Sequence, residues 1–191
     1  MIAEIYFKKG IHMATTKLKG NIVKLAGKGI KVGDSAPTVK VVAKDLSEIK
    51  VGGKSDAVQV IVAVPSLDTA VCASETRRFN TEAAKIQGAT VTIVSMDLPF
   101  AMGRFCTTEG IANLAVGSDF RDKKFANEYG LLIADGPLKG LCARAVFVVN
   151  KSGKVVYKEL CEEITAEPNY EAALSAINEA ACKKKGGCKT K

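Results

Sequence analysis

The residues best suited to chemistry lie in one short stretch, Pro65-Ser66-Leu67-Asp68-Thr69-Ala70-Val71-Cys72. An apolar, β-branched run over residues 57–64 precedes it, and an amphipathic pattern over 73–87 follows it. This order predicts a buried strand and then a helix. A cysteine at such a corner meets free backbone amides and the positive end of the helix dipole, which favour thiolate over thiol. Cys72 is therefore predicted to be a nucleophilic or redox-active thiol.

The remaining cysteines do not form a metal or disulfide pattern. No two of the six lie in a C-x-x-C pair, and the only histidine, His12, lies outside the predicted domain. A Cys-His hydrolase would therefore have no base, and a Cys/His zinc site would have to be all cysteine. The sequence predicts neither a metal site nor a cofactor.

The net charge of +8 does not indicate a nucleic-acid-binding protein. The five lysines of residues 183–191 and the +1 of residues 1–12 account for +6, which leaves +2 for residues 13–182. Aromatic residues make up only 6% and there is no Trp, so base-stacking platforms are not expected. No apolar run approaches the ~20 residues of a membrane span, and no signal peptide is predicted, so the expected location is cytoplasmic.

The chain divides into a leader, one domain and a tail. Residues 1–12 precede a second possible start at Met13 and are predicted to be a leader or an artificially added segment, the alternative being a genuine N-terminal strand. Residues 13–182 have the length of one domain. The lysines and glycines of residues 183–191 predict a flexible basic tail.

The elements that must position Cys72 follow from hydrophobic periodicity. Strands are predicted over 38–43, 48–51, 57–64, 90–96 and 114–116, and helices over 73–87, 100–109, 122–129 and 169–181. Hairpins are predicted from 21–25 with 30–32 around Gly27-Lys28-Gly29, and from 145–150 with 154–159. The two core strands joined by a helix should be parallel. The expected fold is α/β and thioredoxin-like: three α/β/α layers, a mixed central sheet and an N-terminal β-hairpin.

Several runs carry a resemblance to a known family. Pro65, Thr69 and Cys72 satisfy P-x-x-x-T-x-x-C, and further runs are Val42-Ala43-Lys44-Asp45-Leu46, Asp97-Leu98-Pro99-Phe100-Ala101, Arg104-Phe105-Cys106, Ala134-Asp135-Gly136-Pro137-Leu138, Ala143-Arg144-Ala145-Val146 and Glu163-Ile164-Thr165-Ala166-Glu167-Pro168. With these runs, the chain resembles peroxiredoxins and, more closely, bacterial thiol peroxidases, which are atypical two-cysteine peroxiredoxins. The runs extend over nearly all of residues 17–181.

The resemblance implies a role for five residues. Cys72 would be the peroxidatic cysteine and Cys106, 34 residues later, the resolving cysteine of an intrachain disulfide. Thr69 would hydrogen-bond the thiolate and the peroxide oxygens, and Pro65 would shield the site from water. Arg144 would hold sulfur and peroxide together with its guanidinium fork. We expect at least one helix turn to unwind when the disulfide forms, because the two Cα atoms must come within roughly 7 Å.

The resemblance also implies the partners. The substrate would be a hydroperoxide, with alkyl and lipid hydroperoxides preferred over hydrogen peroxide, the reductant would be thioredoxin, and the chain would form a homodimer. An alternative is a redox sensor or partner-docking protein that uses the same disulfide switch. Other thiol-disulfide oxidoreductases are disfavoured because C-x-x-C is missing.

Four cysteines fall outside this pattern. Cys142, two residues before Arg144, lies either near the pocket or in the core as an inert thiol, and Cys161 is interpreted as inert. Cys182 and Cys188 flank the lysines of the tail, where they could bridge each other, bind metal weakly with a partner, or remain exposed thiols.

Overall fold

The computed structural model describes residues 14–182, so the predicted leader, the predicted tail and Cys188 lie outside the described residues. The strands are β1 Thr15–Leu18, β2 Asn21–Ala26, β3 Val39–Ala43, β4 Glu48–Val51, β5 Val58–Ala63, β6 Ala89–Ser95, β7 Ala115–Ser118, β8 Leu132–Ile133, β9 Ala145–Val149 and β10 Val155–Leu160. The helices are α2 Ala70–Ala83, α3 Pro99–Thr108, α4 Lys124–Tyr129 and α5 Tyr170–Cys182.

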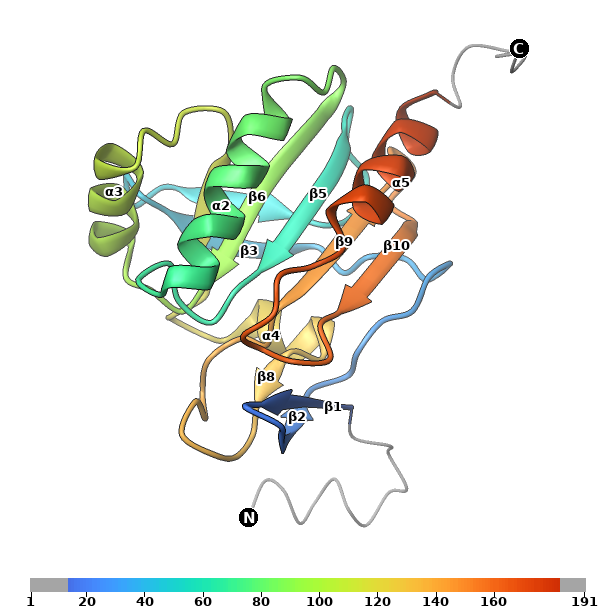
Figure 1. Ribbon diagram of the computed structural model, residues 1–191. Coiled ribbons are helices and arrows are strands. Elements are labelled where there is room, and N and C mark those ends of the chain that lie inside the picture. The colour runs from blue at the N-terminus through green and yellow to red at the C-terminus, as the bar shows by residue number, and fades with distance from the viewer. Residues whose placement is uncertain (1–13, 183–191) are drawn as a thin grey trace.

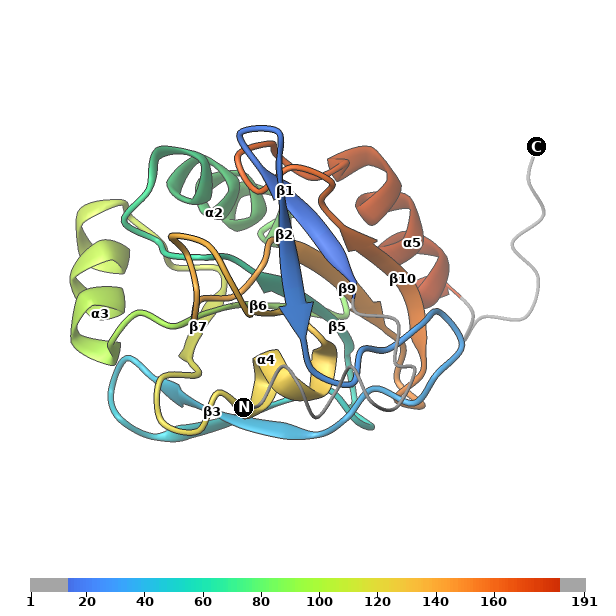
Figure 2. The same cartoon turned by 90° about the horizontal axis from the view of Figure 1, so that it is seen from below.

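A seven-stranded mixed sheet in the order β10-β9-β5-β6-β7-β3-β4 forms the middle layer. β5, β6 and β7 run parallel, and β9 lies antiparallel to β5. Helices α2 and α5 cover one face of the sheet and α4 covers the other, while α3 lies beside β7 (Figures 1 and 2). The predicted α/β, thioredoxin-like architecture is confirmed, including the parallel β5-α2-β6 unit and the late β9-β10 hairpin.

The continuous apolar run of β5 is explained by burial on both faces. Val58, Val60 and Val62 pack in a cluster with α2, α3 and α5, whereas Ile61 and Ala63 pack in a cluster with α4. This alternation is the two-residue period of a strand, and a strand covered by helices on both sides has no polar face.

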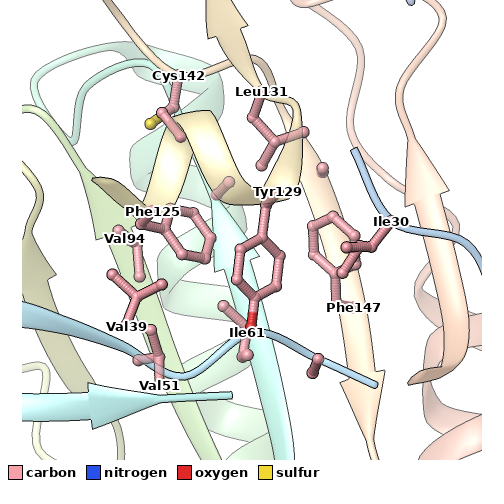
Figure 3. Packing of buried hydrophobic residues seen from close by; sticks show 14 of the residues in the cluster. Ile30, Val39, Val51, Ile61, Val94, Phe125, Tyr129, Leu131, Cys142 and Phe147 are labelled. Carbon is pink, nitrogen blue, oxygen red and sulfur yellow. The ribbon is translucent and has the colours of Figure 1, made fainter. Parts of the chain in front are cut away.

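The cluster beneath α4 is organised around one aromatic side chain. Tyr129 lies between Phe125 and Phe147, with ring centroids 4.5 and 5.2 Å away (Figure 3). Its hydroxyl donates to the carbonyl of Pro37 at 2.9 Å, so the buried polar atom is paired. α4 is thereby tied to the segment that leads into β3.

The predicted hairpin of 21–25 with 30–32 is wrong. β2 pairs with β1 and with β8, and residues 30–32 form no strand. After β2, Gly27 passes the end of α4 with φ +111°, and the amide of Lys28 donates to the carbonyl of Asn127 at 2.8 Å. This long-range contact fixes the chain where sequence alone indicates a local turn. An N-terminal hairpin is present, but β1 and β2 form it.

Two further differences concern the bounds of one helix and the presence of one short strand. α2 begins three residues earlier than the predicted helix and ends at Ala83, before Gly88. The two-residue strand β8, which completes a small sheet with β1 and β2, was not predicted from the sequence. Within residues 14–182, no helix is long and apolar enough to cross a membrane.

Candidate active site

Cys72 is the third residue of α2 and is fully buried. Thr69 is the residue that precedes the helix, with the extended φ and ψ of −123° and 148° that an N-cap adopts. The prediction placed Cys72 just before the helix, but it lies in the first turn. It remains among the helix residues whose amides have no partner within the helix.

Arg144 reaches Cys72 because of the sheet register. Ala145 pairs with Ala63 at the carboxyl end of β5, so Arg144 stands beside the point where the chain leaves for α2. Its Nη2 donates to the Sγ of Cys72 at 3.2 Å, and its Nε donates to the carbonyl of Ile164 at 2.8 Å. The side chain is only 2% exposed, so this charge acts with little screening by water.

Glu75 is the third partner of the same guanidinium. Nη1 of Arg144 donates to Glu75 Oε2, while Glu75 Oε1 is buried without a hydrogen-bond partner among the described residues. Burial raises the pKa of Glu75 to about 7, with the positive charge of Arg144 working in the opposite direction. Burial by itself lowers the pKa of Arg144, but the interactions with Glu75 and Cys72 outweigh this effect, so the pKa of Arg144 is raised. The guanidinium is thus a permanent cation shared between a thiol and a carboxyl group.

Glu75 was not identified from the sequence, although a signal was present. The apolar stripe of α2, extended toward its start, passes through Phe79, Thr76, Glu75 and Cys72, which are the buried residues of this helix. A carboxylate three residues from a cysteine lies on the same helical face. A charged residue on a buried stripe needs an opposite charge, and here Arg144 supplies it.

Cys106 lies within α3 and is 4% exposed. It belongs to the same hydrophobic cluster as Cys72, and both are free thiols. Burial raises the pKa of Cys106, with Lys44 acting in the opposite direction, so this thiol is held protonated. The fold therefore brings the two predicted cysteines into one cluster, each inside a helix.

Thr69 and Pro65 occupy the loop between β5 and α2. Pro65 is buried, whereas Thr69 is exposed. The Thr69 hydroxyl donates to the carbonyl of Ser66 at 3.2 Å and makes no side-chain capping bond to the helix. The structure therefore does not bring this hydroxyl to Cys72 through a hydrogen bond, although it lies one turn away.

Asp97 joins this loop to the start of α3. Its carboxylate accepts hydrogen bonds from the Ser66 hydroxyl, the Leu67 amide and the Ser95 hydroxyl, each at 2.7 Å. A cavity of about 240 Å³ lies beside it, with Leu67, Ala101 and Phe105 among its lining residues. The sequence contains Asp97 within a run typical of the family, but its contacts depend on β5 and β6 being neighbours.

The remaining described cysteines lie in other surroundings. Cys142 is fully buried in the cluster of α4 (Figure 3). It lies on the opposite face of the sheet from Cys72, and burial raises its pKa strongly. Burial raises the pKa of Cys161 to about 12, with Glu159 and Glu75 adding to the effect. Cys182 is exposed at the end of α5. In residues 14–182, His, Cys, Asp and Glu form no group of three or more that could hold a metal ion.

The arrangement around Cys72 fits nucleophilic redox chemistry. The buried sulfur of Cys72 accepts a hydrogen bond from a fixed guanidinium. It also lies in the first turn of α2, where the backbone amides have no partner within the helix. Both features stabilise negative charge on sulfur and on an oxygen that receives charge nearby. A protonated thiol in the same cluster can later take part in a disulfide, provided the backbone moves.

Comparisons with known proteins agree with this chemistry. The redoxin family model matches residues 31–174. The chain is 56% identical over 170 residues to a thiol peroxidase of Leptospira interrogans, covering 88% of this chain and 99% of the relative. It is 53% identical over 176 residues to a thiol peroxidase of Campylobacter jejuni, covering 92% and 98%.

A solved structure gives the same result in three dimensions. The peroxiredoxin-like protein from Aquifex aeolicus has a TM-score of 0.85 and 54% sequence identity, covering 89% of this chain and 99% of that one. The chain therefore belongs to the bacterial thiol peroxidases, thiol-dependent peroxidases with a thioredoxin-like fold.

Proposed function

We propose that this peroxidase reduces hydroperoxides through Cys72 and is reset through Cys106. The Cys72 thiolate attacks the terminal oxygen of ROOH, so that an S–O bond forms as the O–O bond breaks. The products are a Cys72 sulfenic acid and an alkoxide, which takes up a proton and leaves as ROH. The sulfur of Cys106 then attacks the Cys72 sulfur, forming the disulfide and releasing water.

One observation carries the proposal: the hydrogen bond from the buried Arg144 guanidinium to the Cys72 sulfur. Nη2 is held in place because Nε is tied to the Ile164 carbonyl and Nη1 to Glu75. A donor fixed in this way stabilises the thiolate without reorganising during the reaction. The same charge stabilises the alkoxide as the O–O bond breaks.

Two loop residues complete the proposed site. Pro65 is buried in the loop between β5 and α2, and we assign it the role of limiting access of water to the site. Thr69 stands at the start of α2, where its hydroxyl is free to turn from the Ser66 carbonyl toward a bound peroxide. Its assignment rests on its place one turn before Cys72.

The resolving step requires a backbone change. Cys72 is held inside α2 by burial and by Arg144, and Cys106 lies inside α3. Unwinding of at least one helix turn would let the two sulfurs meet. Fast capture also protects Cys72, because a sulfenic acid that waits is oxidised further.

The substrate and reductant are assigned by class. The cavity between the Ser66–Leu67 loop and α3 is lined by Leu67, Ala101 and Phe105 together with polar and charged side chains, so it offers apolar contacts for the alkyl group of the alkyl or lipid hydroperoxide that we assign as the substrate. We assign thioredoxin as the reductant, whose dithiol would exchange with the Cys72–Cys106 disulfide. A reducing compartment, the cytoplasm, matches this chemistry.

The test is peroxide-dependent NADPH oxidation in the presence of thioredoxin and thioredoxin reductase. Wild type should turn over an alkyl hydroperoxide faster than hydrogen peroxide, and Cys72→Ser should be inactive. Cys106→Ser should release about one equivalent of alcohol per chain and then stop. Cys182→Ser, which changes an exposed thiol far along the chain, should match wild type.

Two results would overturn the proposal. Wild type without turnover of any hydroperoxide would remove the catalytic assignment of Cys72. Wild type that forms the disulfide with peroxide but is not recycled by thioredoxin would favour the alternative, a redox sensor that uses the same switch.

A further inference from the structure

The Asp97 carboxylate connects two neighbouring parallel strands, β5 and β6, at the edge of the sheet where both strands end. Oδ1 accepts from the hydroxyl of Ser66, and Oδ2 accepts from the amide of Leu67, both at 2.7 Å. Ser66 and Leu67 belong to the loop that leads from β5 into α2. Asp97 itself follows β6 and precedes Leu98, the N-cap of α3. One side chain therefore contacts the loop that leads into α2, the helix that carries Cys72, and adjoins α3, the helix that carries Cys106.

Asp97 is fixed from the sheet side. The hydroxyl of Ser95 donates to Oδ2 at 2.7 Å and accepts from the Asp97 amide at 3.1 Å. The hydroxyl of Ser118, at the end of β7, donates to the Asp97 carbonyl. Ser95 and Ser118 are buried, so the aspartate is held by two central strands. The Ser66–Leu67 loop is the other side of this contact, and its release would also take Leu67, 3% exposed, out of the cluster that holds Cys72.

From this geometry we propose that Asp97 is a positioning residue that clamps the Ser66–Leu67 loop, which leads into the first turn of α2, in its peroxide-reactive conformation. Its release is then part of the step in which Cys72 meets Cys106. This inference rests on the proposed Cys72–Cys106 disulfide. The clamp sets how long the Cys72 sulfenic acid stays in the folded site before Cys106 captures it.

The chemistry of the contact explains why a carboxylate is used. Three donors converge on its two oxygens, and hydrogen bonds to a charged acceptor are stronger than neutral ones. An asparagine in the same place would offer one acceptor oxygen and direct an NH₂ group at donors. The adjacent cavity of about 240 Å³, lined by Leu67, Asp68 and Phe105 among others, gives the released loop space.

Two effects of Asp97→Asn follow. The reactive conformation is less populated, so Cys72 oxidation slows. The unwound conformation is more populated, so the rate of disulfide formation rises relative to the rate of over-oxidation to sulfinic acid, which needs the folded site. A residue with a merely structural role would lower thermal stability without changing the ratio of disulfide to sulfinic acid.

The first experiment measures amide hydrogen exchange in the reduced protein, without peroxide. In Asp97→Asn the Leu67 amide and the first turn of α2 should exchange about tenfold faster, as expected for loss of a charged hydrogen bond. The rates in α5 should stay as in wild type. Asp135→Asn is the matched control. The Asp135 carboxylate also accepts a hydrogen bond from a backbone amide far away in the sequence, that of Lys24, at 2.9 Å, but this contact lies outside the Ser66–Leu67 loop.

The second experiment uses intact mass after a pulse of excess alkyl hydroperoxide. Asp97→Asn should give about threefold less sulfinic acid per disulfide than wild type or Asp135→Asn. Ser66→Ala, which removes one of the three donors, should change both readouts in the same direction by a smaller factor. It keeps the clamp testable if Asp97→Asn does not fold.

The clamp is overturned if both Asp97→Asn and Ser66→Ala leave Leu67 exchange and the product ratio at the wild-type values. Wild type that forms no Cys72–Cys106 disulfide overturns the proposed function instead. The exchange measurement in the reduced protein still tests whether Asp97 holds the loop in that case.

Discussion

At the scale of single residues, the site depends on how one guanidinium divides its donors. Arg144 bonds Cys72, Glu75 and the Ile164 carbonyl with three different nitrogens. A lysine has one ammonium and lacks this planar fork, so it cannot make the three bonds in the same geometry. The sulfur contact is the one that bears on the chemistry, and the other two fix its position.

Arg144→Lys should therefore lower the second-order rate constant of Cys72 oxidation by about a hundredfold or more, the usual cost of removing one fixed donor to developing negative charge. Competition with a second peroxidase measures this rate. Arg121→Lys is the matched control, since Arg121 lies over the ring of Phe120 and not at Cys72. Equal rates for the two variants would contradict the proposed role of Arg144.

Glu75 makes stability depend on pH. Its pKa is raised from 4.5 to about 7, so the folded state holds the proton more tightly than the unfolded state. The stabilisation from this group is present below about pH 4.5 and is lost as pH rises through about 7. Glu75→Gln does not titrate, so the stability of the variant relative to wild type should rise as pH rises through this window.

Urea unfolding of both proteins under reducing conditions at pH 5 and pH 8 measures this change. The difference in unfolding free energy between Glu75→Gln and wild type should be larger at pH 8. A difference that is the same at both pH values would show that Glu75 does not titrate in this range.

At the scale of elements, the parallel pairing of β5 and β6 decides where the chemistry occurs. Parallel strands end at the same edge of a sheet, so the chain leaves for α2 and for α3 side by side. Each helix carries one of the two proposed redox cysteines, and Asp97 lies between them. Disulfide formation therefore depends on the unwinding of these helices as well as on the reactivity of the two thiols.

Oxidation should reduce amide protection in the first turn of α2, in α3 around Cys106, or in both. Burial and Arg144 hold Cys72 inside its helix, so the proposed disulfide needs one of these segments to unwind. Hydrogen exchange of reduced and peroxide-treated protein measures this, with α5 as the internal control. Reduced and oxidised structures with the same backbone at both cysteines would contradict the prediction.

Gly27→Ala should destabilise the protein far more than Gly20→Ala. Both glycines have positive φ, +111° and +81°, so each substitution has a backbone cost of about 1 kcal/mol. Only at Gly27 would the new Cβ collide with the carbonyl of Asn127, while at Gly20 it meets open space. We expect at least about 2 kcal/mol more loss for Gly27→Ala by urea unfolding. Equal losses would mean that the chain readjusts past α4.

At the scale of the whole molecule, two neighbouring exposed apolar residues form a candidate surface for the homodimer that the family resemblance implies. Leu98 and Phe100, at the start of α3, are 51% and 69% exposed. Large apolar side chains exposed together are typical of interaction surfaces. They follow Asp97 in the chain, so a homodimer formed through them would bury the surface beside the contact of Asp97 with the Ser66–Leu67 loop.

Phe100→Glu should shift the protein from dimer to monomer in sedimentation velocity, because a buried unpaired carboxylate is costly. Ile22→Glu is the matched control, since Ile22 is 70% exposed on β2, away from α3. Wild type that sediments as a monomer, or a Phe100→Glu variant that remains a dimer, would contradict this interface.

Much of the fold was predictable because its signals are local. The β-branched runs of β5 and β6, the stripe of α2 and the turn between β9 and β10 each predict their element. The prediction was wrong after β2, where residues 27–28 are fixed by Asn127, about a hundred positions later. No local pattern encodes that contact.

The sequence by itself determined the class of this protein through the runs of a thiol peroxidase, and it predicted the reactive group, a Cys72 thiol after an apolar strand with no histidine within the domain. The tertiary structure decided which distant groups act on that thiol. The register of β9 on β5 brings Arg144 to the sulfur, and the pairing of β6 with β5 brings Asp97 to the loop. Charge and hydrogen bonding act over a few ångströms, so only folding brings these groups within range.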